Sequence, residues 1–198
     1  MGMSMDDEKD IPPTYIDLSR FTMPASFRGK PAWFVQLWWL VQDWLIHPSP
    51  QFMYGWRRFW WRAFGAQVGQ KVLIRPSARV TFPWKVRVGD YAWIGDRAEL
   101  YSLAPITIGK NAVISQDTTL CAGSHDYTKI GFPLIAHPIV VEDEVWVAAG
   151  SFVAQGVTIG KGAVIGAKSV VLESMPASMI CVGHPAKPLK PRPVPSVE

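Results

Sequence analysis

The chain has 198 residues, with 48% hydrophobic and 18% charged residues and a formal net charge of +4. This balance is typical of a folded chain and excludes a disordered one, and the length suits one domain with a small appendage. The modest positive charge does not require a nucleic-acid partner and would suit a small polyanionic ligand. The two cysteines lack metal-type spacing, which indicates free thiols in a reducing compartment.

The first residues are acidic and polar, unlike a secretory signal, so we expect a cytoplasmic chain. Two helices are expected, from Trp33 to Ile46 and from Met53 to Phe64, separated by a proline-containing break. Their tryptophan, phenylalanine and arginine content suggests that residues 31–64 make a peripheral contact with the inner membrane surface. The alternative, which we favour, is that these helices pack on the rest of the chain and cover an open edge.

From Val68 onward an aliphatic residue recurs at every sixth position, in five groups of three hexads. A period of six fits neither an α-helix nor an alternating strand, and a fixed repeat indicates stacked units that share a core. The aliphatic positions expected to point inward are Val68, Ile74, Val80, Val88, Ile94, Leu100, Ile108, Ile114, Leu120, Val141, Val147, Val153, Ile159, Ile165 and Val171. Glycines that follow several of them are expected to turn corners, where a Cβ or a negative φ would clash.

Insertions occur after Val80, Leu100 and Leu120, each time at the end of three hexads. They would all leave from one edge of a prism with three hexads per coil. We therefore predict an all-β-dominated fold: a three-sided parallel β-helix of about five coils, with an N-terminal helical segment and one long loop at residues 126–140. A β-sandwich would instead show alternation and hairpin signals. The expected units are 1–66 (tail and aromatic-rich helices), 67–182 (β-helix) and 183–198 (closing turn and tail).

Three stretches carry a family resemblance: TLCAGSHDY at residues 119–127, FPLIAHPIVVEDEVWVAAGSFVAQGVTIGKGAVIGAKSVV at 132–171, and GHPAK at 183–187. They resemble the hexapeptide-repeat acyltransferases, most closely those of colanic-acid and other exopolysaccharide biosynthesis. The resemblance implies left-handed coils and a homotrimer with active sites between subunits. It also implies acetyl-CoA as co-substrate, no required metal, and a saccharide hydroxyl, free or lipid-linked, as acceptor.

His125 lies beside the long loop, at the position where the resembling enzymes place their catalytic histidine. A neutral imidazole can take the proton of a hydroxyl that attacks a thioester, so His125 is the predicted general base. Asp126 could orient the imidazole or simply form a turn. His137 is expected to be structural, and the loop is a candidate wall of the acceptor site.

The resemblance assigns the acceptor side only loosely. Some relatives hold the acceptor with a second polar residue, often an asparagine, in an earlier coil, and no asparagine matches here. Glu99, Tyr101 and Ser102 are the candidates, with no ground for choosing among them.

The donor side matches the family better. Trp146 matches a tryptophan that lies beside the pantetheine arm of coenzyme A in relatives. Ala149 and Ala167 match positions whose backbone groups bond the pantetheine amides, where small side chains allow close approach. The closing turn supplies the remaining cofactor-binding candidates, with the lysines as partners for the phosphates: Gly183, Pro185, Lys187 and Lys190, with Arg192 as a further basic residue.

Three other functions stay open at this point. The chain could acetylate another small acceptor, such as a serine, an amino sugar or an antibiotic. It could be a metalloenzyme of the γ-carbonic-anhydrase type, but His125, His137 and His184 lack the close spacing of that zinc site. It could also be a non-catalytic trimeric scaffold.

Overall fold

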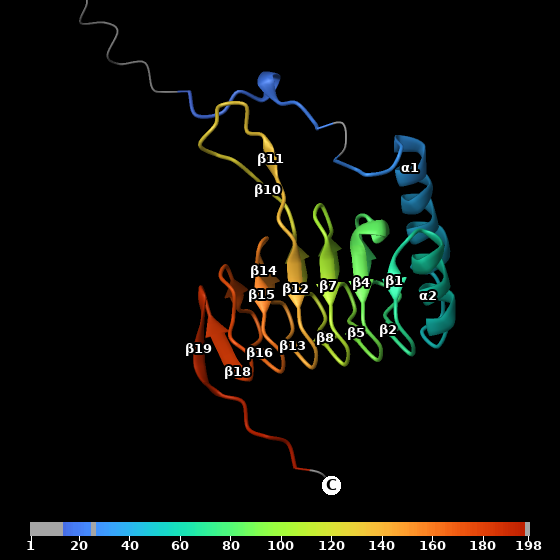
Figure 1. Ribbon diagram of the computed structural model, residues 1–198. Helices are drawn as coiled ribbons and strands as arrows, with labels where there is room; N and C mark the ends of the chain where they lie inside the picture. Colours follow the sequence, from blue (N-terminus) through green and yellow to red (C-terminus); the bar gives the residue numbers. More distant parts are fainter. Residues whose placement is uncertain (1–13, 25–26, 197–198) are drawn as a thin grey trace, which may run out of the picture.

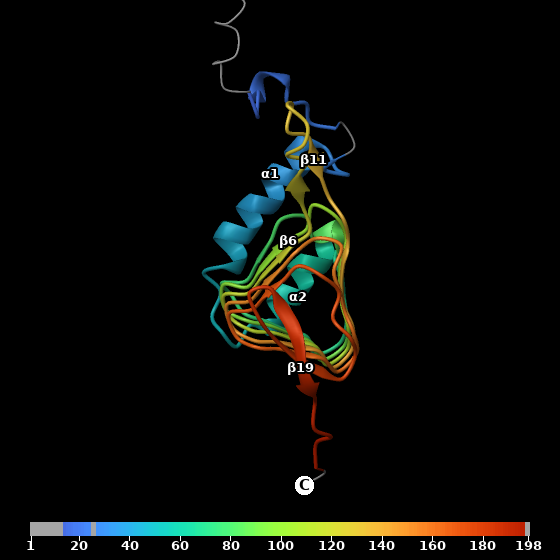
Figure 2. The ribbon, with the colours of Figure 1, turned by 90° about the vertical axis from the view of Figure 1, so that its left-hand side faces the viewer.

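The computed structural model describes residues 14–24 and 27–196. The chain forms a left-handed parallel β-helix in which very short strands stack into a column (Figure 1). Viewed along the column, the coils superpose into a triangle (Figure 2). Five complete coils run from β1 to β17, and an isolated bridge at Met175 and strand β18 begin a sixth turn. The expectation of about five coils is confirmed, with this partial turn added.

Each side of the triangle is one sheet. The first sheet contains β1 (Gln67–Val68), β4 (Val86–Val88), β7 (Ile106–Ile108), β12 (Ile139–Val141) and β15 (Thr158–Ile159). The second contains β2 (Leu73–Ile74), β5 (Trp93–Ile94), β8 (Val113–Ile114), β13 (Trp146–Val147), β16 (Val164–Ile165), β18 (Met179–Gly183) and β19 (Ala186–Pro191). The third contains β3 (Arg79–Val80), β6 (Glu99–Tyr101), β9 (Thr119–Cys121), β14 (Phe152–Val153) and β17 (Val170–Val171).

The hexad aliphatics form the core. All fifteen are buried, and the most exposed of them, Val68, reaches only 9%. Equivalent hexads pair in register, so that Ile94 lies over Ile114 and Ile114 over Val147. The inward positions predicted from the period of six are therefore confirmed.

The corner glycines are needed for close approach between coils. A Cβ on Gly89 would lie 2.6 Å from the backbone nitrogen of Lys110 in the next coil, a distance that real Cβ atoms do not tolerate. Positive φ angles occur elsewhere in the turn, for example 60° at Tyr91 and 56° at Asn111. The expectation that a Cβ would clash at these glycines is therefore confirmed. The expectation that they need a positive φ is wrong, because the positive φ angles occur at neighbouring residues that are often not glycine.

A helical layer covers the first coil (Figure 1). It consists of α1 (Ala32–Val41), the π-helical turn η3 (Gln42–Ile46) and α2 (Tyr54–Ala63), preceded by the short 3-10 helix η2 (Leu18–Arg20). Trp38 of α1 and Trp61 of α2 are fully buried. Among the described residues, no helix is both long enough and apolar enough to cross a bilayer.

Side chains of this layer satisfy the exposed backbone edge of the first coil. Arg57 donates to the carbonyl oxygen of Ile74, and Arg58 and Arg62 donate to three further carbonyl oxygens of the same coil. The indole N–H of Trp38 donates to the carbonyl oxygen of Val80 over 2.9 Å. Unpaired edge groups of a sheet invite aggregation, and these contacts pair several of them. The packing interpretation of the helices is thus confirmed for their buried faces.

One hairpin and a single helical turn project from the column, and a second hairpin ends it. Strands β10 (Ser124–His125) and β11 (Leu134–Ile135) pair antiparallel and project from it within the long insertion (Figure 1). Strands β18 and β19 pair antiparallel at the far end. The 3-10 turn η4 (Pro83–Lys85) fills the insertion after the first coil.

Candidate active site

His125 is fixed by its own hairpin. Its Nδ1 atom lies 2.8 Å from the carbonyl oxygen of Phe132, and its imidazole stacks on the Phe132 ring. Phe21, from the N-terminal segment, packs against the same imidazole, with 5.9 Å between ring centroids. That segment is tied to the hairpin by a 2.8 Å hydrogen bond from the Asp17 N–H to the carbonyl oxygen of Ile130. The imidazole is therefore half-buried and in contact with two aromatic rings.

Asp126 points to a different partner. Its carboxylate accepts hydrogen bonds from the side chain and backbone of Thr128 and lies 3.4 Å from Lys129 Nζ. The Thr128 hydroxyl, together with the Thr128 N–H and Lys129, holds the pKa of Asp126 below its ordinary value. The group that orients the imidazole is the Phe132 carbonyl, and Asp126 stabilises the hairpin turn.

The acceptor candidates lie at the same corner of the prism as His125, one coil earlier. Tyr101 ends β6 and pairs with Cys121 of β9. Burial raises the pKa of the Tyr101 phenol, so this group remains a hydrogen-bond donor. Ser102 is fully buried, and its hydroxyl bonds both backbone groups of Phe82. Ser102 is thus engaged in the core, whereas Glu99 and Tyr101 line a surface groove shared with η3.

The donor candidates lie at another corner, between the second and third sheets. Trp146 is 47% exposed, and its indole N–H donates to the Ser115 hydroxyl over 2.9 Å. Ala149 follows β13 and Ala167 follows β16, one coil apart. Within the described chain, the N–H groups of these two alanines form no hydrogen bond, so both are available to an external acceptor. Lys168, which the sequence reasoning missed, lies on the same corner and covers Gly150 with its side chain.

The closing turn forms the β18–β19 hairpin. Gly183 has a φ of 112°, which requires glycine, and its N–H donates to the Ser169 hydroxyl. Pro185 is exposed in the turn. Lys187 Nζ lies 3.2 Å from a carboxylate oxygen of Glu173, and Lys190 is exposed further along β19.

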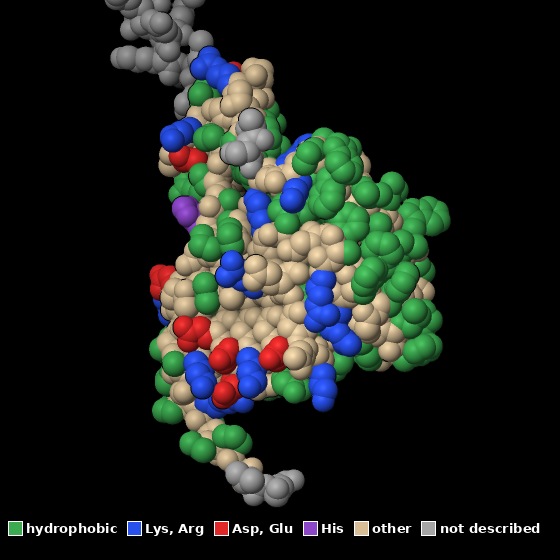
Figure 3. Space-filling model, turned by 45° about the vertical axis from the view of Figure 1, so that its right-hand side comes forward, with side chains coloured by type: hydrophobic (Ala, Val, Ile, Leu, Met, Phe, Trp, Pro, Cys, Tyr) green, Lys and Arg blue, Asp and Glu red, His purple; other side chains and the backbone are tan. Residues whose placement is uncertain are grey.

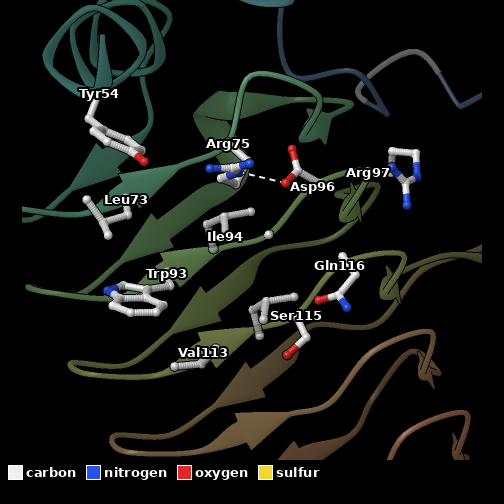
Figure 4. Close-up of a pocket in the computed structure, with 12 residues that line it drawn as sticks. Tyr54, Leu73, Arg75, Trp93, Ile94, Asp96, Arg97, Val113, Ser115 and Gln116 are labelled. Carbon is white, nitrogen blue, oxygen red and sulfur yellow. Dashed lines mark hydrogen bonds and ion pairs between the residues drawn. The ribbon is translucent and has the colours of Figure 1, made fainter. Parts of the chain in front are cut away.

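A cavity of about 670 Å³ extends along the corner that carries the donor candidates, on the earlier coils (Figure 4). Arg75 and Asp96 form an ion pair of 2.7 Å across it, and Trp93 and Ser115 line it. Trp93 is in register with Val113, and Val113 with Trp146, so these side chains form one outward row. No motif in the sequence indicated this cavity.

The structure brings only some predicted residues together. His125 and the acceptor candidates share the corner that follows the third sheet, whereas Trp146 and the two alanines border the corner between the second and third sheets. Among residues 14–24 and 27–196, no three His, Cys, Asp or Glu side chains are grouped so that they could hold a metal ion.

Comparison with known sequences identifies related proteins. Residues 138–173 match the model described as "Bacterial transferase hexapeptide (six repeats)", and residues 85–116 match "Hexapeptide repeat of succinyl-transferase". The putative colanic acid biosynthesis acetyltransferase WcaF of Escherichia coli is 51% identical over 176 residues, covering 89% of this chain and 97% of that protein. The galactoside O-acetyltransferase of Escherichia coli is 26% identical over 129 residues, 63% of each chain.

Solved structures share the fold. A hexapeptide-repeat acetyltransferase from Vibrio cholerae aligns with a TM-score of 0.75 and 28% identity, over 88% of this chain and 97% of that one. The same protein in complex with acetyl coenzyme A aligns with a TM-score of 0.71, at 28% identity, over 81% of this chain and 86% of that one. Identity to a colanic acid acetyltransferase along nearly its whole length shows that the chain belongs to the hexapeptide-repeat acyltransferase family.

Proposed function

We propose that the chain transfers the acetyl group of acetyl-CoA to a saccharide hydroxyl in exopolysaccharide biosynthesis of the colanic-acid type, with His125 as general base. The observation that carries this proposal is the 2.8 Å contact between His125 Nδ1 and the Phe132 carbonyl oxygen. A carbonyl oxygen can only accept, so Nδ1 carries the proton and Nε2 retains its lone pair. That tautomer is the one a general base needs.

During transfer, Nε2 takes the proton of the acceptor hydroxyl while the hydroxyl oxygen attacks the thioester carbonyl carbon. The imidazolium that forms is stabilised through Nδ1 by the Phe132 carbonyl. His125 then gives the proton to the departing sulfur. The bond from carbon to sulfur breaks, the new ester bond replaces it, and coenzyme A leaves as a thiol.

The donor corner supports this chemistry. Ala149 and Ala167 are one coil apart, have small side chains, and donate no backbone hydrogen bond within the described chain, which suits the amide carbonyls of an extended pantetheine arm. Trp146 offers an exposed ring beside them. Lys187 and Lys190 at the end of the column supply positive charge for the phosphates.

We infer that the active enzyme is a homotrimer. The proposed base and the proposed donor corner lie on different edges of one prism, so a neighbouring chain must bring one of them to the other. The second sheet presents a continuous outward row of apolar side chains that could contact such a neighbour: Leu73, Trp93, Val113, Trp146, Val164 and Ile180.

An acetyl-CoA donor places the reaction in the cytoplasm, where we propose that the enzyme acts. A saccharide acceptor carried on a lipid would lie at the inner membrane surface. Contact of residues 31–64 with that surface would bring the active site to such an acceptor.

The decisive experiment measures thiol release from acetyl-CoA against a panel of nucleotide-linked and lipid-linked sugars, with serine and amino sugars included. His125→Ala is expected to lower kcat about 10²- to 10⁴-fold while acetyl-CoA affinity stays unchanged. His137→Ala, which alters an exposed histidine of the same insertion, is the matched control. Wild-type turnover in His125→Ala would remove the general-base role, and turnover confined to amines would replace the saccharide hydroxyl as acceptor.

A further inference from the structure

The helical layer has a second apolar face that the column does not cover. On α1, Trp33, Leu37 and Leu40 lie on the side opposite the buried Val35 and Trp38. The spacing of three and four residues places the exposed side chains in one stripe along the helix. Trp33 is 67% exposed and Leu40 is 57% exposed. The helix is therefore apolar on both sides, although only one side is needed for packing.

The stripe continues across the neighbouring helix. Trp56 of α2 donates its indole N–H to the carbonyl oxygen of Leu45, which ties the two helices together. Figure 3 shows the hydrophobic side chains gathered over this end of the molecule, with basic side chains at the border. We use the name cap surface for six of the exposed apolar residues of this layer: Trp33, Leu37, Leu40, Trp44, Phe52 and Phe59.

The charge around the cap surface is positive. Residues 27–66 contain five basic residues and one acidic residue. Arg57 is fully buried and does not contribute to this surface. Arg58 and Arg62 are at least partly exposed and donate to neutral carbonyl oxygens of the first coil, so these bonds do not neutralise their charges. Arg28 and Lys30 are exposed just before α1. Exposed tryptophan and leucine next to uncompensated positive charge match the headgroup region of an anionic membrane.

We propose that the cap surface binds the interface of a bilayer that contains anionic lipids, with α1 lying in the plane of the membrane. A helix of ten residues is about 15 Å long, too short to cross a bilayer but suited to shallow insertion. The expected strength of binding rests on the proposed trimer. Three parallel columns around one axis would turn all three cap surfaces the same way, and their combined binding would exceed that of a single chain.

The test is flotation of the full-length protein with vesicles of phosphatidylcholine alone and of phosphatidylcholine with phosphatidylglycerol. The wild type is expected to float with the anionic vesicles and to bind less as salt concentration rises. The double variant Leu40→Ser with Trp44→Ser is expected to lose roughly tenfold or more in partitioning, since two exposed apolar side chains are removed. The control, Leu189→Ser, removes an exposed leucine at the opposite end of the column and should float as the wild type does.

Two further measurements separate the outcomes. Melting temperature and light scattering report whether the double variant folds and keeps its assembly, and acetylation of a water-soluble acceptor reports the active site independently of membranes. Equal flotation of the wild type and the double variant, or no flotation of the wild type, would overturn the proposal. Loss of assembly in the double variant without vesicle binding by the wild type would show that a second copy covers the surface. Flotation by an inactive preparation would support the membrane surface even if the proposed reaction failed.

Discussion

The imidazole of His125 lies flat against the ring of Phe132, with 4.3 Å between ring centroids and 5° between planes. The backbone carbonyl of the same phenylalanine meets Nδ1. Phe132 has a φ of 47°, in the left-handed region that large side chains rarely adopt. One residue therefore sets both the tilt and the tautomer of the imidazole, and the hairpin holds it in a conformation that it would not choose alone.

The first prediction concerns Phe132 as a positioning residue. Phe132→Ala keeps the carbonyl but removes the stacked ring, a contact of about 1 kcal/mol, so kcat is expected to fall about 2- to 10-fold. The KM for acetyl-CoA should stay unchanged, and Phe132→Tyr should restore kcat. Steady-state kinetics of the three proteins checks this. A 2- to 10-fold rise in the KM for acetyl-CoA at constant kcat would speak against a role in positioning the base.

The second prediction concerns the corner glycines. Gly89→Ala is expected to lower the free energy of unfolding by about 1–3 kcal/mol, because the new Cβ would meet the backbone of the next coil at 2.6 Å. Gly55→Ala in α2 is the control. Its Cβ would have 3.8 Å to the nearest atom, so this variant should be unchanged or more stable by about 0.5–1 kcal/mol. Thermal melts at one protein concentration compare them, and equal melting temperatures would contradict the steric explanation.

The third prediction concerns Arg57, which is fully buried between the helical layer and the first coil. Its guanidinium group donates to the carbonyl oxygens of Ile74, Pro50 and Gln51. Arg57→Met would leave these acceptors unpaired, and we expect a loss of about 3 kcal/mol in the free energy of unfolding. Arg87→Met, on an exposed outward position of β4, should change it by less than about 0.5 kcal/mol. Urea titrations of both variants give the comparison.

The fourth prediction concerns pH. Burial lowers the pKa of His47 below its ordinary value, with the charge of Arg79 acting in the same direction and Asp43 acting against both. The unfolded chain therefore binds a proton on His47 at a higher pH than the folded chain does. Stability should fall as the pH drops through about 6.5. The melting temperature of His47→Gln should depend less on pH between 7.5 and 5.5, and parallel curves for both proteins would refute the assignment.

The fifth prediction concerns the ion pair between Lys187 and Glu173, 3.2 Å apart and exposed. If Lys187 meets a phosphate of coenzyme A, Glu173 competes for the same charge. Glu173→Gln should lower the KM for acetyl-CoA about twofold, and Lys187→Ala should raise it severalfold with a weaker dependence on salt. Identical KM values for Lys187→Ala and the wild type at low salt would exclude the contact.

The sequence was sufficient for the column but not for its attachments. The period of six placed Ile94, Ile114 and the other inward positions correctly, because each coil repeats the same steric demand on one residue. It also located His125 at the start of the insertion. The Phe132 carbonyl that sets its tautomer left no trace in the sequence, since every residue carries a backbone carbonyl.

The helical layer shows a second kind of limit. Apolar residues surround α1, so periodicity alone could not tell the buried side at Trp38 from the exposed side at Leu40. Arg57 and Arg62 donate to carbonyl oxygens of the column, and nothing in the sequence pattern indicated these partners. Only the structure shows that one side of the aromatic segment packs on the column and that the other side is exposed.

Both terminal rungs of the column are closed, one by the helical layer and the other by the β18–β19 hairpin. The hairpin that carries His125 leaves the column after the third coil, so its distance from the helical layer along the column can change only in whole coils, each about 4.8 Å. Adding or deleting eighteen residues, one complete coil, between the helical layer and this hairpin would shift His125 by one coil along the column. Both ends of the column would stay closed. The distance between the cap surface and His125 is therefore set in steps of one coil.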